Sequence, residues 1–461
     1  MKAKRILLFI IILLVIVAVA IGILYFKTDI FKTNAQKFWK YGSKNMDVIE
    51  LFNNHDMQDI RNKRSNNPYM IESKLNVRNQ SNRYNITAKS SAQDSNNVIT
   101  DVDIKYNDND IFKFVLAKKS NLFAFMSKEL ASGFIAVKNN NIQELAKEAG
   151  VEDVSNIPDS INWFSILDLL YVQESDQKYF VETYAKIIEE NTSKENYSEE
   201  ESNVEINDET HTANAYRFVL TEKETKEIAK KILLYMKDED ARAINFISSR
   251  LKLLNVPKKY TEHDAITGEI AKLIEQVDAI DATDEKFIEA TVYVENKQTI
   301  QTDIKIKDGS VIKIIFKKDE NKLYITQDKV NEYLANSNNP IVSYIGNLKE
   351  ITLSNEIGED KSSSTIKFLA KLFNDIEVDY DSKITIGNAG NPSLEFEKTP
   401  RIVLNEMESD KLKTTYGMIV YGLNKIYENK KSLINSSSIF GDTVNNNQTN
   451  TTEENSETEE N

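Results

Sequence analysis

Three pairs of aspartates stand two residues apart, the spacing that places two carboxylates on one face of a β-strand. The pairs are Asp101 with Asp103, Asp108 with Asp110, and Asp379 with Asp381. Two such carboxylates could act as general acid and general base on a glycosidic bond. Each pair adjoins a polar turn or lies on the polar side of an alternating segment, so we interpret all three as solvated acids.

Other catalytic patterns are missing from the sequence. It contains no G-x-S-x-G, no phosphate-binding loop, no Gly-rich dinucleotide turn and no cysteine. Its three histidines, His55, His211 and His263, are far apart, and a metal site would need all of them to converge. We therefore expect no catalytic residue, no metal, no cofactor and no enzymatic activity.

The N-terminus predicts a membrane anchor. Lys2, Lys4 and Arg5 precede an unbroken apolar run at residues 6–26, which as a helix spans roughly the 30 Å core of a bilayer. A cleaved signal peptide is the alternative, because residues 18–20 read Ala-Val-Ala, but the apolar run continues beyond them.

The charges beside this run predict its orientation. The basic residues before it place residues 1–5 in the cytoplasm, although lysines also follow the run. We thus expect a single-pass protein of the cell membrane, with residues 27–461 outside the cell.

Composition excludes one class of partner. The formal net charge is −14, and residues 435–461 contain six acids and no lysine or arginine. Non-specific nucleic-acid binding needs clustered cations, so we expect no nucleic-acid partner. The polar, acidic composition of residues 435–461 predicts a disordered tail.

Alternating apolar and polar residues predict two antiparallel meanders. The first covers about 69–138, with Phe112, Phe114 and Leu116 on one side of a strand, and the second begins at Phe287. Asp308-Gly309 predicts a type I′ hairpin turn in the second. Segregated strands and helices favour an α+β fold, with meander sheets covered by amphipathic helices.

Helices are expected between and after the meanders. The segments are a block at 141–190, a pair within 221–255 that starts at a capping box of Thr221 and Glu224, a stretch near 264–281, and a closing helix at 408–428. Residues 191–210, rich in glutamate, are expected to form a solvated loop.

The expected organisation outside the membrane has four parts. They are a juxtamembrane helix at 27–60, a first meander with helices at 61–220, a helical pair with the second meander and the closing helix at 221–434, and the tail at 435–461. Phe38 and Trp39 could lie at the lipid interface, or they could pack on the folded part.

The long hairpins of Ile111–Met126 and Thr299–Tyr324, behind a single N-terminal anchor, support a resemblance. The layout resembles uncharacterised membrane-anchored envelope proteins of low-GC Gram-positive, clostridia-like bacteria. It is more distantly similar to the lipoprotein-carrier superfamily, in which a curved sheet wraps a helix-lined apolar cavity. That resemblance implies binding of acyl chains or an apolar partner, and it carries over no catalytic residue.

These observations favour a non-enzymatic, membrane-anchored, extracytoplasmic protein that binds a lipid-like ligand or an envelope protein. Phe112, Phe114, Trp163 and Phe164 are candidate walls of the ligand cavity, with ordinary core packing as the alternative. A structural or assembly component of the envelope is the second hypothesis. A cell-wall hydrolase is the third, because it would need acids that converge in a cleft.

Overall fold

The computed structural model describes residues 33–42, 54–79, 82–163, 168, 171–206, 209–317, 320–335, 346–392 and 394–435. The expected anchor at 6–26 lies outside the described residues, as does the expected tail beyond Asn435. Within the described ranges, no helix combines the length and the apolar character that crossing a membrane requires.

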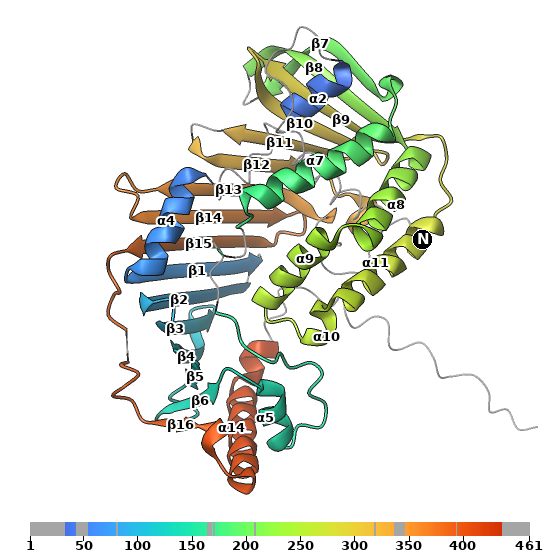
Figure 1. The fold of residues 1–461 in the computed structure, drawn as a ribbon. Coiled ribbons are helices and arrows are strands. Elements are labelled where there is room, and N and C mark those ends of the chain that lie inside the picture. Colours follow the sequence, from blue (N-terminus) through green and yellow to red (C-terminus); the bar gives the residue numbers. More distant parts are fainter. Residues whose placement is uncertain are drawn as a thin grey trace, which may run out of the picture.

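One sheet of sixteen strands forms the body of the protein (Figure 1). Its strand order is β16-β6-β5-β4-β3-β2-β1-β15-β14-β13-β12-β11-β10-β9-β8-β7. All neighbours pair antiparallel except β16 and β6, which are parallel. The strands of the first half are β1 (Tyr69–Asn79), β2 (Asn82–Asp94), β3 (Asn97–Tyr106), β4 (Asn109–Lys119), β5 (Leu122–Met126), β6 (Phe134–Lys138), β7 (Tyr197–Ile206) and β8 (Glu209–Thr221). Those of the second half are β9 (Lys286–Glu295), β10 (Gln298–Ile306), β11 (Val311–Lys317), β12 (Lys322–Gln327), β13 (Leu348–Ile357), β14 (Ser363–Leu372), β15 (Glu377–Ile386) and β16 (Arg401–Val403).

The two meanders are parts of this one sheet. β1 pairs with β15 from Tyr69 to Arg78, with Leu75 opposite Tyr380. β8 pairs with β9, so the sheet also continues across the boundary expected at residue 220. Together with the helices, this arrangement confirms an α+β fold built on an antiparallel-rich sheet.

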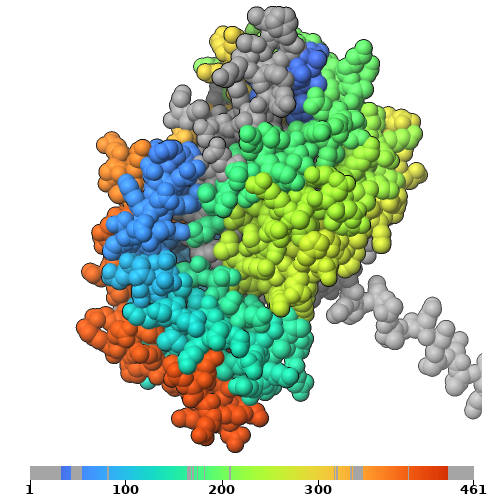
Figure 2. Space-filling model, viewed as in Figure 1, coloured from blue at the N-terminus to red at the C-terminus, as the bar shows by residue number. Residues whose placement is uncertain are grey.

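Most helices lie on one face of the sheet, which we call the inner face (Figure 1). In the space-filling view, α8, α9 and α11 form a continuous layer, while α4 lies apart from them over the middle strands (Figure 2). The helices are α2 (Asn34–Gly42), α4 (His55–Asn66), α5 (Ile142–Glu148), α7 (Glu174–Glu190), α8 (Glu222–Asp238), α9 (Ala241–Leu253), α10 (Lys258–Thr261), α11 (His263–Asp278), α12 (Glu332–Ala335) and α14 (Ser409–Asn435), with short 3₁₀ turns at Lys194–Asn196 and Leu404–Glu406.

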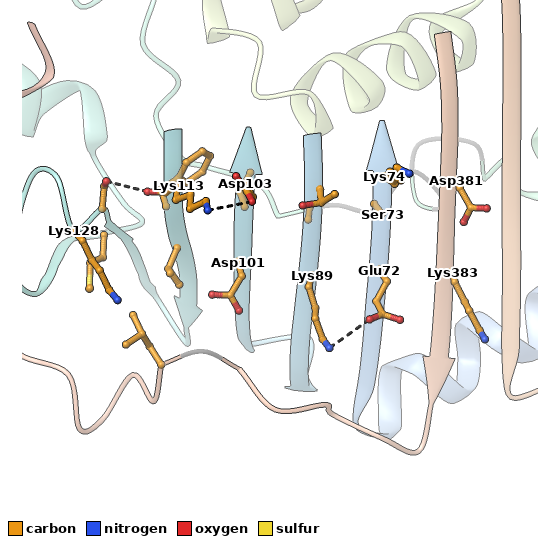
Figure 3. Close-up of a pocket in the computed structure, with 18 of the residues that line it drawn as sticks. Glu72, Ser73, Lys74, Lys89, Asp101, Asp103, Lys113, Lys128, Asp381 and Lys383 are labelled. Atoms are coloured by element: carbon orange, nitrogen blue, oxygen red, sulfur yellow. Dashed lines mark hydrogen bonds and ion pairs between the residues drawn. The ribbon is translucent and has the colours of Figure 1, made fainter. Parts of the chain in front are cut away.

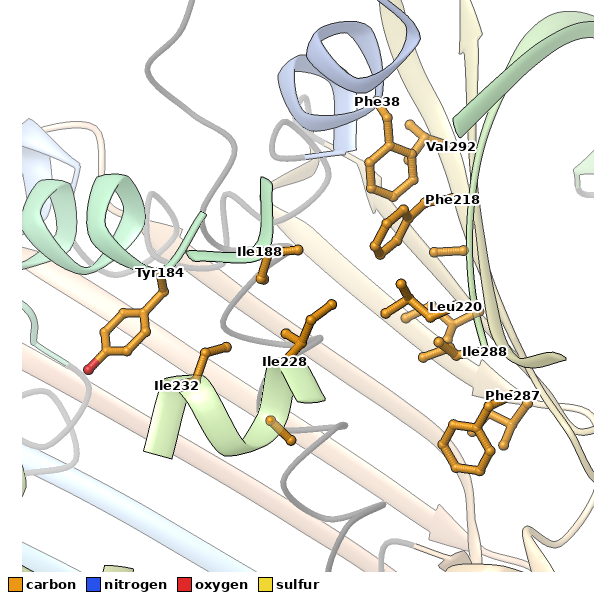
Figure 4. Packing of buried hydrophobic residues seen from close by; sticks show 14 of the residues in the cluster. Phe38, Tyr184, Ile188, Phe218, Leu220, Ile228, Ile232, Phe287, Ile288 and Val292 are labelled. Carbon is orange, nitrogen blue, oxygen red and sulfur yellow. The ribbon is translucent and has the colours of Figure 1, made fainter. Parts of the chain in front are cut away.

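The main core lies between β7–β11 and the helices α2, α7, α8 and α11 (Figure 4). Helix α8 begins at the expected capping box, because the Thr221 hydroxyl accepts a hydrogen bond from the Glu224 N–H and Glu224 binds back to the Thr221 N–H. Its apolar stripe then buries Ile228 and Ile232. Phe38 of α2 is 2 % exposed and packs on Phe218, so α2 packs on the folded part at this residue.

Two local expectations from the sequence were wrong, one about the glutamate-rich segment and one about the turn at Asp308-Gly309. Most of the glutamate-rich segment expected to be a loop at 191–210 is a strand: Tyr197–Ile206 form β7, an edge strand whose Glu200 binds Arg217 of β8 at 2.5 Å. Charges of this kind suit an edge strand because they discourage pairing with other chains. Composition alone predicted a loop, but hydrogen bonding to the neighbouring strand β8 makes this segment a strand.

The hairpin at Asp308-Gly309 exists, but its turn is not type I′, because only Gly309 has a positive φ there, of 78°. Two-residue turns with positive φ at both positions occur instead at Asn107-Asp108 and Asn296-Lys297. Within the helical block expected at 141–190 the structure has α5 and α7, while residues 164–167, 169 and 170 lie outside the described part of the chain. The closing helix expected at 408–428 runs from Ser409 to Asn435.

Candidate ligand-binding site

An aromatic wall covers the inner face of the sheet at β4 and β5. Alternation along β4 turns Phe112 and Phe114 to the same side, with ring centroids 5.3 Å apart. Phe125 of β5 lies 6.2 Å from Phe112 and 5.6 Å from Phe114. All three rings are only partly buried, so this wall is not sealed as the main core is.

A second aromatic contact extends the wall. Phe123 lies two residues before Phe125 on the same side of β5, and its ring centroid is 6.1 Å from that of Trp163. Trp163 also packs against the cluster of α4 that contains Met57 and Ile60. The indole therefore joins the sheet to a helix of the inner face.

A pocket of about 470 Å³ opens between these strands and the segment 161–163. Its size lies within the range of small-molecule sites, and most of its lining is apolar. The lining residues are Leu116, Phe123, Ala124, Phe125, Ile135, Val137, Ile161, Asn162, Trp163 and Asn255.

The segment 161–163, which we call the strap, is held by two asparagine side chains. Asn139 donates to the Ile161 carbonyl at 2.9 Å and accepts from the Ile161 N–H at 2.6 Å. Asn255 donates to the Asn162 carbonyl at 3.1 Å and accepts from its N–H at 2.5 Å. Asn139 follows β6 and Asn255 follows α9, so the strap ties the sheet to the helical layer across the pocket.

Three of the four residues predicted from the sequence meet at this wall. Phe112 and Phe114 touch Phe125, and Trp163 reaches the same surface through Phe123. Phe164 lies outside the described residues. Whether any of them contacts a ligand stays a prediction.

Sequence reasoning missed Phe123, Phe125 and the two asparagines. The phenylalanines had a signal, because the run Leu-Phe-Ala-Phe-Met at 122–126 alternates large and small residues like a strand. The asparagines had none, because their role depends on contacts with a segment far away in the sequence.

The opposite face of the sheet carries a charged hollow of about 1000 Å³ (Figure 3). Oppositely charged residues face each other across neighbouring strands, and Lys89 binds Glu72 at 3.4 Å. Lys113 lies 3.6 Å from Asp103 and 2.8 Å from Asp110. The lining contains lysines and acids in near balance, which suits a solvated surface better than a site for one charged ligand.

Two of the three aspartate pairs fall on this charged side and not in a closed cleft, and the third, Asp108 with Asp110, lies where the chain turns from β3 into β4. Asp101, Asp103, Asp379 and Asp381 all line the hollow. The pKa of Asp110 is lowered by its hydrogen bond with Lys113. A carboxyl held ionised by a lysine is a poor general acid, so the geometry here does not resemble an acid–base pair.

The histidines do not converge. His55, His211 and His263 belong to α4, β8 and α11, and each faces an acid, at 3.3, 3.2 and 3.5 Å respectively. Within the described ranges, His55, Asp56 and Asp59 form one group close enough to share an ion. Lys361 already binds Asp56 at 2.6 Å and His55 is exposed, so this group has no built metal site.

The comparisons with known proteins place the chain in a family without assigning a role. Intact Ap-TbpB, with its N and C lobes, is 7 % identical over 69 % of this chain and 77 % of its own, with a TM-score of 0.11. The MucA/MucB complex of Pseudomonas aeruginosa is 4 % identical over 71 % of this chain and 93 % of its own, with a TM-score of 0.11. Such low scores carry no argument.

No curated protein matches the chain. A family match, by contrast, extends over residues 1–394, which include the aromatic wall, the pocket and the strap. The chain therefore belongs to DUF6583, a family of unknown function.

Proposed function

We propose that this protein is a non-enzymatic, membrane-anchored binding protein of the cell envelope, which holds an apolar, lipid-like ligand against the inner face of its sheet. The observation that carries the proposal is the aromatic pocket of about 470 Å³ under the strap. Burying an alkyl chain there would contribute about 25 cal/mol per Å² of apolar surface removed from water.

The anchor and the outside location rest on the sequence alone. The apolar run at 6–26 with basic residues before it supports a single span with the folded part outside. Proteolysis of intact cells tests this placement: an external protease should remove residues 33–435 and leave a fragment of the N-terminus. Protection of the whole chain would contradict it.

Photocrosslinking in native membranes tests the ligand class. The full chain is treated with a long alkyl alcohol that carries a diazirine, and labelled peptides are mapped by mass spectrometry. Labelling of 112–137 and 161–163, in addition to 6–26, is expected. Labelling confined to 6–26 would show contact with bilayer lipid only and would contradict an apolar site on the folded part.

One observation favours a second candidate, assembly with an envelope protein. Helix α14 exposes an apolar stripe that contains Tyr416, Val420, Leu423 and Tyr427, each 36 to 45 % exposed. These positions repeat at helical spacing and lie together on one side of the helix. Replacing Leu423 and Tyr427 with serine should then abolish crosslinks to an envelope partner without changing the photolabelling of the pocket.

A further inference from the structure

The exposed apolar surface of the protein is concentrated on one helix. Of the nine large apolar side chains that are exposed in the described part of the chain, six belong to α14. They are Tyr416, Met418, Val420, Tyr421, Leu423 and Tyr427. The helix forms the lower tip of the molecule, where a partner can reach it from outside (Figures 1 and 2). A concentration of this kind marks an interaction surface.

One side of α14 is fixed to the folded part. Leu412, near the start of the helix, is 1 % exposed and packs in a cluster with Leu145 of α5. Further along, Leu130 packs directly against Gly422, where a larger residue would displace it. The exposure of the other sides therefore belongs to a helix that is held in place.

Exposed apolar residues occupy both flanks of this helix. Helical spacing puts the stripe that contains Tyr416 and Leu423 on one flank and puts Met418 and Tyr421 about half a turn away. Met418 is 61 % and Tyr421 is 71 % exposed. A protein partner seated on one flank would leave the other flank in water. A layer of lipid head groups and upper acyl chains can surround both flanks, as it does around an amphipathic helix at a membrane surface.

The charges of α14 favour an anionic lipid surface. The helix contains five lysines, two acids and no arginine, in a chain whose formal net charge is −14. Residues 414–424 carry no charge, while Lys411 and Lys413 precede them and Lys425 and Lys431 follow them. Lysines at both ends of an apolar stretch can reach lipid phosphates while the stretch enters the interface.

The same charges argue against two other occupants. A second copy of the chain would bring two basic helices together, and their lysines would repel each other. Protein interfaces are enriched in arginine and depleted in lysine, the reverse of the composition of α14.

We propose that α14 docks on an anionic lipid bilayer, with its apolar flanks between head groups and acyl chains and its lysines on lipid phosphates. This inference rests on the part of the proposed function that tethers the protein to a membrane, and it adds a second contact with the bilayer. Val137 lines the pocket under the strap and also packs against the cluster that seats α14. Docking would therefore bring the pocket close to a source of apolar ligand.

Site-specific fluorescence tests the proposal with the full chain in nanodiscs. The chain contains no cysteine, so Tyr421→Cys provides a single attachment point on α14 for the fluorophore nitrobenzoxadiazole. The matched control is Tyr260→Cys, at an exposed tyrosine of α10. The discs contain phosphatidylcholine with or without phosphatidylglycerol, and a lipid that carries a nitroxide quencher near its head group. Phosphatidylglycerol should produce quenching at position 421 and none at position 260.

Lysine substitutions measure the electrostatic part of the docking. One lysine near an anionic surface contributes about fivefold to the ratio of docked to undocked helix, so Lys413→Gln with Lys425→Gln should lower this ratio about thirtyfold. The control pair, Lys186→Gln with Lys272→Gln, removes exposed lysines of α7 and α11 and should leave the quenching unchanged. Added salt should act like the first pair, because it screens exposed charges. Circular dichroism shows whether each variant is folded.

The outcomes separate this inference from the function on which it rests. Absence of quenching at position 421 in discs that contain the protein would overturn the docking, and crosslinks from that position to a protein in native membranes would assign the helix to an envelope partner instead. Equal quenching with and without phosphatidylglycerol would overturn the anionic surface. A chain that does not enter the discs would contradict the anchor. The same labelled chain, mixed with vesicles of the two compositions, would then test α14 by itself.

Discussion

The inner face of the sheet is closed at one end and partly open at the other. At β7–β11, Val292 is 0 % and Phe218 is 7 % exposed beneath the helices (Figure 4). At β3–β5, the rings of Phe112, Phe114 and Phe125 keep intermediate exposure although their strands alternate in the same way. The alternation of apolar and polar residues along a strand determines which side of the sheet is apolar. The layer above that side determines whether its side chains become buried core or stay partly exposed.

The covering layers differ in kind. The closed end is covered by α8 and α11, whose apolar stripes bury Ile228, Ile232 and Ile270 against the strands. The open end is covered in part by the strap, which is held by asparagine hydrogen bonds and by the packing of one side chain, Trp163. Side-chain packing is costly to undo, whereas a few hydrogen bonds open with little free energy. We therefore expect the open end to admit a ligand of the proposed kind without unfolding of the closed end.

The largest expected effect compares one residue type at the two ends. Ile232→Ala removes a side chain that is 1 % exposed and should lower the free energy of unfolding by about 3 kcal/mol, because a cavity remains in packed surroundings. Ile135→Ala, in the partly open pocket, should lower it by about 1 kcal/mol. Urea unfolding followed by circular dichroism measures both, and equal losses would contradict the division of the inner face.

The sequence predicted the pieces of this arrangement better than their assembly. Alternating apolar and polar residues predicted the strands of both meanders, and the capping box at Thr221 predicted the start of α8. The pairing of β1 with β15 could not be predicted, because it joins segments about three hundred residues apart with no turn between them. Of the four residues predicted for a ligand cavity, Trp163 lines the pocket and Phe112 and Phe114 lie beside it against Phe125, and their contact with a ligand stays a prediction. The asparagines of the strap depend on tertiary contacts that leave no local pattern in the sequence.

Loosening the strap should produce the next largest effect. Asn139→Ala removes two hydrogen bonds to Ile161 and should lower the free energy of local opening by about 2 kcal/mol. Hydrogen exchange at 161–163 should speed up while exchange in α8 stays unchanged. Asn121→Ala, which alters an exposed asparagine bonded to Asn140, is the control. Unchanged exchange at the strap would show that Trp163 packing, and not the asparagines, holds it.

Acid should weaken the closed end first. Burial alone would raise the pKa of Glu222, but hydrogen bonds from Thr283 and Lys307 bring it down to about 2. Because the folded pKa lies below the ordinary 4.5, the stabilisation is complete above that value and is lost as pH falls from about 4.5 toward 2. After screening, we expect about 1 kcal/mol.

Glu222→Gln should flatten this part of the pH profile of stability, measured as the urea midpoint at each pH. Glu285 also contacts Lys307, at 2.5 Å, but is mostly exposed, so Glu285→Gln is the matched control and should leave most of the dependence in place. A profile unchanged by Glu222→Gln would show that other acids determine the acid sensitivity of this end.

The smallest effect is expected on the charged face. Glu72 and Lys89 lie 3.4 Å apart with side chains 48 and 46 % exposed, so a double-mutant cycle with glutamine at both positions should give a coupling of about 0.5 kcal/mol or less. The coupling should fall further with added salt, because the pair is open to solvent. A salt-resistant coupling several times larger would mean that water is excluded from the hollow. The charged face would then also enclose a region without water. In that case the difference between the closed and the partly open end of the inner face would no longer be enough to say where the proposed ligand binds.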